Sequence, residues 1–295
     1  MKKIFLFTLL TVAVYQVVAQ DHYIPLASMI HQRFEAPANR VGSTVHTAIK
    51  PWRSGELKAM CNTDSILFQE VTLRGITNTK VGNRIFNQPL FSVQGEDYVL
   101  RLNPVVDFSF TREQEFNRNL LIFSRGLQVQ GTIGKGFSFY SQFNENQNEY
   151  PAYIDDFIRL RRVVPGLTRA KDGDGKKDFA WSSGTISYSL KKYFNFQFGH
   201  DKNFIGDGYR SMLLSDYAPN YPFLKINTTI WKIKYMNLYS VMQDINIKPP
   251  ANYNEEDFSF RKKVLLNPLF KHSNWETCNL RNFRRCGLAT RFYSC

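Results

Sequence analysis

Cysteine and long apolar runs are both scarce in this chain. Four cysteines occur among 295 residues, none in a CxxC spacing, and no histidine stands where it would complete a zinc site with them. After residue 20, no stretch approaches the ~20 apolar residues of a transmembrane helix. We therefore predict no metal site, and any membrane span would have to be a β-barrel, because only helices and closed barrels satisfy every backbone group in lipid.

Acidic residues are fewer than basic ones, 25 against 38, which leaves a net charge of +13. The basic residues are scattered and form no clustered stripe, so a nucleic-acid partner is not expected. Scattered cations are typical of a solvated surface. Basic loops that face an acidic polysaccharide are the alternative that this charge leaves open.

The chain also lacks a recognisable catalytic motif. No serine or cysteine occupies a nucleophile elbow, and the adjacent His200 and Asp201 form a pair that is common in polar loops. The run Asp172–Asp178 resembles a calcium loop, but Lys176 and Ser183 occupy positions where an EF-hand needs oxygen ligands. The acidic residues lie mostly in loops rather than as paired carboxylates on facing strands. We predict no catalytic residues and no cofactor.

The first nineteen residues have the features of a secretory signal peptide. Lys2 and Lys3 precede an apolar core over Ile4–Val14, and small residues at 17–19 provide a cleavage site. We therefore expect export through the Sec pathway.

Residues 20–97 show only weak periodicity. Ile24, Ile30 and Phe34 lie at near-helical spacing and predict a short helix, whereas Ser65–Arg74 fits either a helix or a strand. We interpret this region as a small mixed or helical N-terminal portion, periplasmic or plug-like.

From Tyr98 onwards the pattern becomes one of strands. Aromatic residues make up 15% of the chain, and Phe137, Phe139 and Phe143 alternate with polar residues after a tight turn at Gly134–Gly136. Short turns alternate with long polar connections, of which residues 144–181 are the longest, with a short helix predicted at Tyr153–Arg162. This asymmetry and the apolar-out, polar-in alternation favour an outer-membrane barrel. A soluble sandwich or jelly roll has the same period and stays open.

The stretch Phe194–Met242 predicts a strand, a polar loop and a second long strand. Aromatic rings in this loop stand beside polar side chains, a combination that suits sugar binding because ring faces pack on pyranose C–H surfaces. The candidate polysaccharide-binding residues are Tyr209, Arg210, Asp216, Tyr217, Asn220 and Tyr221. The alternatives are an aromatic girdle at a membrane interface, ordinary loop packing, and a turn at Gly206–Gly208 that caps the strand.

Three segments together resemble the capsule-assembly Wzi family, and most closely its gliding-motility members of the RemB type. They are GLQVQGTIGKGFSFYSQFNENQ at 126–147, VVPG at 163–166, and FGHDKNFIGDGYRSMLLSDYAPNYPFLKINTTIWKIKY at 198–235. The resemblance covers residues 98–263. It implies an outer-membrane β-barrel with a helical periplasmic portion and a lectin-like, non-enzymatic role. The implied partners are outer-membrane lipid, surface polysaccharide, and motility or secretion machinery.

The chain departs from this family after Lys263. Residues 264–295 hold a single acidic residue, three of the four cysteines and no sustained period of two. We interpret Val264–Cys295 as a non-family tail, a truncation or frameshifted read-through, the alternative being a genuine short basic segment. Residues 98–263 would then encode only the first part of a barrel, with an open edge.

These patterns predict an all-β, antiparallel outer-membrane barrel, incomplete as encoded, that serves capsule or exopolysaccharide assembly or gliding motility by binding polysaccharide. A secreted, soluble, β-rich carbohydrate-active enzyme is the alternative. Cell fractionation separates the two.

Overall fold

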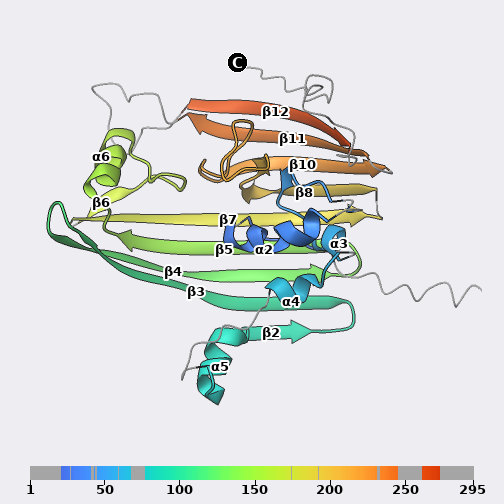
Figure 1. Ribbon diagram of the computed structural model, residues 1–295, viewed down its shortest axis with the longest axis horizontal. Coiled ribbons are helices and arrows are strands. Elements are labelled where there is room, and N and C mark those ends of the chain that lie inside the picture. Colours follow the sequence, from blue (N-terminus) through green and yellow to red (C-terminus); the bar gives the residue numbers. More distant parts are fainter. Residues whose placement is uncertain are drawn as a thin grey trace, which may run out of the picture.

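A computed structural model of the protein describes residues 21–26, 28–40, 43, 45–58, 60–67, 77–173, 175–191, 193–230, 233–244 and 261–272. Figure 1 shows a broad sheet of antiparallel strands, with short helices gathered in front of it. The antiparallel β architecture predicted from the alternating pattern is confirmed. The predicted signal peptide, residues 1–19, lies outside the described residues.

The N-terminal portion contains the short elements α2 (Ser28–Ala38), β1 (Ile49–Lys50), α3 (Ser54–Leu57), α4 (Thr63–Leu67) and α5 (Lys80–Asn87). Helix α2 is the one predicted from the spacing of Ile30 and Phe34. The ambiguous stretch from residue 65 begins as the end of α4, and residues 68–76 lie outside the described part of the chain. Across all described ranges, no helix has the length and apolar character needed to cross a membrane.

The sheet is built from hairpins whose strands are mostly neighbours in the chain. Its strands are β2 (Phe91–Gln94), β3 (Tyr98–Glu113), β4 (Arg118–Ile133), β5 (Phe137–Asn148), β7 (Lys176–Leu190), β8 (Phe194–Asp201), β10 (Tyr221–Ile230), β11 (Ile233–Asp244) and β12 (Arg261–His272). Their order is β12-β11-β10-β8-β7-β5-β4-β3-β2, with the short β6 (Lys171–Gly173) beside β7. Among the described strands, β2 and β12 remain at opposite ends of this order and do not pair with each other.

Tight turns join neighbouring strands at one end of the sheet. The turn predicted at Gly134–Gly136 joins β4 to β5, and Gly134 adopts a φ of +61°, which glycine tolerates without the strain that a Cβ would bring. Lys191, with a φ of +53°, begins the turn from β7 to β8. The first of these turns lies where the sequence predicts it, and both precede strands in regular antiparallel register.

The two faces of the sheet have opposite polarity. One face carries exposed apolar side chains, among them the cross-strand neighbours Ile186, Phe198 and Leu224 at the middle of the sheet. The residues next to these in sequence point to the other face, are polar and are buried: Ser187, Gln197 and Lys225. Because successive strand residues alternate between faces, the period of two in the sequence produced this separation directly. The predicted alternation of apolar and polar faces is confirmed.

The N-terminal portion packs on the polar face rather than on the apolar one. Tyr23 donates a hydrogen bond from its hydroxyl to Asn195 of β8 and accepts one at 3.0 Å from the Asn227 side chain of β10. Helices α2 and α3 lie in front of the middle strands in Figure 1. The described residues place no second layer of the protein over the exposed apolar face.

The long polar connection predicted at 144–181 is shorter than expected. Strand β5 continues to Asn148, and β7 begins at Lys176, so that both ends of the predicted loop are paired strand. The predicted helix is present as α6, Ala152–Arg161. The prediction failed at its ends because Asn144, Asn146 and Asn148 have a loop-like composition. They are buried, however, on the polar face of the sheet.

Strand β12 extends past the predicted boundary at Lys263. Residues 264–272 continue β12 and pair with β11, for example Leu266 with Tyr239. These nine residues thus form paired strand although they lack a sustained period of two, and the interpretation of residues 264–295 as a non-family tail stays a prediction. Pro268 interrupts the sequence pattern, but a proline is tolerated here because β12 is the last described strand of the sheet. Residues 273–295 lie outside the described part.

Candidate functional site

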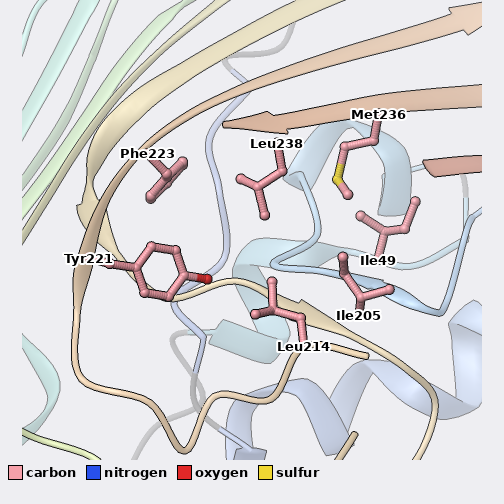
Figure 2. Close-up of a cluster of buried hydrophobic side chains, with 7 residues drawn as sticks. All are labelled: Ile49, Ile205, Leu214, Tyr221, Phe223, Met236 and Leu238. Atoms are coloured by element: carbon pink, nitrogen blue, oxygen red, sulfur yellow. The ribbon is translucent and has the colours of Figure 1, made fainter. Parts of the chain in front are cut away.

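The loop from Gly206 to Asn220 connects β9 (Phe204–Ile205) to β10 and holds most of the predicted sugar-binding residues. It folds towards the polar face because Leu214 enters a buried cluster with side chains of β1, β9, β10 and β11. Figure 2 shows this cluster, in which Leu214 lies below Leu238 and next to Ile205, and Ile205 lies below Ile49. A backbone hydrogen bond of 2.9 Å from Ile205 to the Leu214 carbonyl closes the loop. The apolar cluster thereby fixes the base of the loop and leaves its tip in solvent.

Three of the predicted residues form one surface cluster at the tip of this loop, which we call the Tyr–Arg patch: Tyr209, Arg210 and Tyr217. The Arg210 guanidinium carbon lies 4.3 Å from the centre of the Tyr217 ring and 5.6 Å from that of Tyr209. Both distances are within the range of cation–π attraction, which orders the arginine without neutralising its charge. Tyr209 is 78% exposed. The patch therefore presents two aromatic rings and one cation to solvent.

The other three predicted residues do not belong to the exposed patch. Tyr221 is buried in the cluster of Figure 2, and its hydroxyl accepts a hydrogen bond of 3.0 Å from the backbone of Asn203. Asn220 donates from its side chain to the Ser182 carbonyl at 2.7 Å, which attaches the loop to β7. Asp216 accepts a hydrogen bond from Ser215 at 3.3 Å. Tyr221 is a packing residue, so its prediction as a ligand-binding residue conflicts with its burial.

The connection after α6 supports the Tyr–Arg patch from the side. Gly166 adopts a φ of +74°, and a Cβ at this position would lie 3.2 Å from the Tyr217 carbonyl oxygen. The Lys202 side chain donates to the Gly166 carbonyl at 2.5 Å. A glycine is therefore required here both by its backbone conformation and by the close approach of the two loops. Within the VVPG motif, Gly166 thus contacts the aromatic loop, whereas Val164 packs in a separate core with Ile158 and Phe179.

The other motifs considered in the sequence do not form reaction centres. His200 and Asp201 are consecutive residues of β8, so their side chains point to opposite faces of the sheet. Asp172 forms an ion pair with Lys177, which also lies 2.9 Å from Asp155. These ion pairs connect α6 with β6 and β7, which is a structural role.

A second group of polar residues, which sequence reasoning missed, lies between the N-terminal portion and the sheet. Glu56 of α3 lies 2.8 Å from Lys234 of β11 and 3.0 Å from Arg53, which in turn lies 2.9 Å from Asp21. All four side chains are largely buried. Burial alone would raise the pKa of Glu56, but Lys234 and Arg53 outweigh it and hold the pKa at about 2. Glu56 therefore stays ionised at neutral pH.

Lys225 of β10 is a further charged residue beneath the N-terminal portion, and it is almost fully buried. Its ammonium group donates to the Asn203 side chain at 2.9 Å and lies 4.6 Å from the centre of the Tyr23 ring. Tyr23 thus covers a lysine of the sheet, and burial raises the pKa of its own hydroxyl. Alternating polar positions such as Asn195 and Gln197 signalled a polar face in the sequence. Tyr23, however, which bonds to Asn195 and Asn227, stands well over a hundred residues away in sequence, so no local pattern identified this contact.

Comparison with known proteins found no match, whether to a family model, to a curated protein or to a solved structure.

Proposed function

We propose that this protein is a non-enzymatic protein of the outer membrane whose strands form the first part of a lipid-embedded β-barrel. Its Tyr–Arg patch binds surface polysaccharide, in capsule or exopolysaccharide assembly or in gliding motility. The resemblance to the Wzi family suggests this function. The observation that supports it most directly is the polarity of the sheet, whose exposed face is apolar and whose buried face is largely polar.

The physical argument concerns what can cover the apolar face. Phe, Ile, Leu and Tyr side chains remain exposed along strands from β3 to β12. A monomer in water seldom exposes a continuous apolar surface of more than a few hundred Å², because each Å² withdrawn from water stabilises it by about 25 cal/mol. Lipid acyl chains would cover this face completely. The polar face would then line the interior, as it does in barrels of the outer membrane.

The two ends of the strands support the same orientation. At one end of the strands lie the tight turns that follow β4 and β7, and at the other end lie α6, the start of the connection from β8 to β10, and the short turn between β3 and β4. Outer-membrane barrels have short turns on the periplasmic side and longer loops outside the cell. The Tyr–Arg patch accordingly belongs to the outer surface, where it would meet exported polysaccharide.

The patch has the chemistry of a sugar-binding surface. Tyr209 and Tyr217 offer ring faces for the C–H surfaces of a pyranose, and Arg210 offers charged donors to hydroxyl or carboxylate oxygens. Aromatic rings lose little conformational entropy on binding and are common anchors of interfaces. A flexible polymer with many equivalent units could engage such a small patch repeatedly.

The localisation is tested by fractionating cells that produce the full chain. We expect the protein in the outer-membrane fraction and resistant to extraction by alkaline carbonate. Recovery in the periplasm or medium would refute the membrane assignment and favour the soluble enzyme instead.

Polysaccharide binding is tested by affinity electrophoresis in gels that contain the exopolysaccharide of the producing cells. We expect the Tyr209→Ala and Arg210→Ala variants to bind more weakly, each by about 1–2 kcal/mol, which is roughly 5–30-fold. Tyr153→Ala is the matched control, because Tyr153 is equally exposed, on α6, but is not part of the patch. Equal retardation of all variants would refute the patch as the binding site.

A further inference from the structure

The described residues between 21 and 58 (21–26, 28–40, 43 and 45–58), which we call the cover segment, have a hydrophobic core of their own. Its buried members within these residues are Ile24, Phe34, Ala38, Val45, Trp52 and Leu57. Backbone hydrogen bonds from Ile24 to Trp52 at 2.9 Å and from Ser54 to His22 at 2.8 Å tie its two ends together. None of these core members belongs to a strand of the large sheet. The cover segment therefore has an internal source of stability that does not depend on the sheet.

The cover segment meets the rest of the protein through polar side chains and through the pairing of β1 with β9. Tyr23 bonds to Asn195 and Asn227, and Asp21 accepts a hydrogen bond from Ser189 at 3.2 Å. Ile49 of β1 joins the apolar cluster of Figure 2, and the backbone of Gly206 donates a hydrogen bond of 2.8 Å to the Ala48 carbonyl. Water can replace hydrogen bonds of this kind when two surfaces separate, so a polar interface resists opening much less than an apolar core does.

An ion pair between two largely buried side chains, Glu56 and Lys234, crosses this interface. One Glu56 oxygen is shared between Lys234 at 2.8 Å and Arg53 at 3.0 Å. Removing one partner of a buried pair leaves the other charge desolvated and unpaired, which is strongly destabilising. Opening the interface instead would return both charges to water. The intact pair therefore stabilises the contact between the cover segment and the sheet, and the loss of either partner weakens that contact.

From these contacts we infer that the cover segment is a releasable lid on the polar face of the sheet, and that the Glu56–Lys234 pair is its latch. Opening moves the segment away as a unit, with its own core preserved, and exposes the buried polar side chains beneath it. Lys225 is the most direct indicator of this state, because Tyr23 of the lid covers its side chain. The inference is independent of polysaccharide binding.

Acetylation of lysine side chains with a hydrophilic, amine-reactive reagent tests the inference on the full chain. Mass spectrometry follows each lysine separately. In Glu56→Gln and in Lys234→Met, we expect Lys225 to react about tenfold faster or more than in the wild type, because the latch no longer holds the closed state. Lys171, which is exposed, serves as the internal reference for reagent strength.

Two controls separate lid opening from general unfolding. Lys177 is buried on the same sheet beneath α6, away from the lid, and its reactivity should stay at the wild-type level. Glu35→Gln removes a carboxylate that pairs with Lys50 inside the cover segment at 3.6 Å, and it should leave Lys225 protected. Protection of Lys225 in both latch variants would overturn the inference. So would a rise at Lys177 together with Lys225, because the lid would then not open as a separate unit.

Discussion

Replacing Phe198 by arginine tests whether the apolar face of the sheet lies in lipid. Phe198 projects from β8 and is 59% exposed, between Ile186 and Leu224 on the neighbouring strands. At about 3.3 Å per residue it lies roughly 13 Å along the strand from Phe194. This is about half way across the ~25 Å apolar band of an outer-membrane barrel. The substitution therefore places a charge near the expected middle of the bilayer.

The expected cost differs sharply between lipid and water. An arginine on the lipid face near the bilayer midplane destabilises a barrel by about 2–4 kcal/mol. An exposed residue in water, substituted away from special features, usually changes the free energy of unfolding by no more than about 0.5 kcal/mol. Phe116→Arg is the matched control, because Phe116 is 54% exposed but lies in the turn between β3 and β4.

The assay is denaturant unfolding of each variant from lipid vesicles, with the free energy extrapolated linearly to zero denaturant. We expect Phe198→Arg to lose about 2–4 kcal/mol and Phe116→Arg to lose much less. Equal effects of the two substitutions, or a loss at Phe198 no greater than about 0.5 kcal/mol, would refute the lipid-facing orientation. Detergent micelles in place of vesicles should reduce the difference, because a micelle adapts to a charge more readily than a bilayer does.

Three further predictions concern the lid and the loops. Glu56 has a folded-state pKa of about 2 against an ordinary 4.5, so it contributes about 3 kcal/mol to the free energy of unfolding. This contribution is present above pH 4.5 and is lost as the pH falls towards 2. Glu56→Gln should abolish this pH dependence in acid unfolding curves. Burial, with Lys50 nearby, lowers the pKa of His31 to about 4 from 6.5. The free energy of unfolding should therefore fall by about 3 kcal/mol as the pH drops from 6.5 to 4, and His31→Phe should remove this slope. A flat profile in the wild type would contradict the burial of a neutral ring. Gly166→Ala should cost about 1–2 kcal/mol because of its left-handed backbone, whereas Gly184→Ala, which meets only ordinary contacts, should cost less; thermal unfolding compares the two.

The sheet was predictable where the side-chain pattern was local. Phe137, Phe139 and Phe143 alternate with polar residues, and Gly134 permits the turn before them, so the hairpin and its two faces follow from neighbouring residues. The prediction failed where composition misled it. The asparagines of β5 have the composition of a loop, and Pro268 of β12 breaks an alternating run, yet backbone pairing accommodates both.

The candidate site was predictable only in part, for a related reason. A cluster of tyrosines with one arginine is visible within a dozen residues, and the structure groups Tyr209, Arg210 and Tyr217. Burial of Tyr221 depends on Ile49 and Leu238, which are distant in sequence, so nothing near the loop distinguished it from its exposed neighbours.

The amino-acid sequence by itself determined the alternating strands, the turn at Gly134–Gly136 and the opposite polarity of the two faces, because each depends on residues one to four positions apart. It did not determine the ends of β5 and β7 or the length of β12. The tertiary structure alone decided what covers the polar face. The pairing of Glu56 with Lys234 joins residues 178 positions apart, and the placement of Tyr23 over Lys225 likewise spans most of the chain. Such contacts form because buried charges and hydroxyls must find partners wherever the folded chain brings them, and no local pattern encodes that choice.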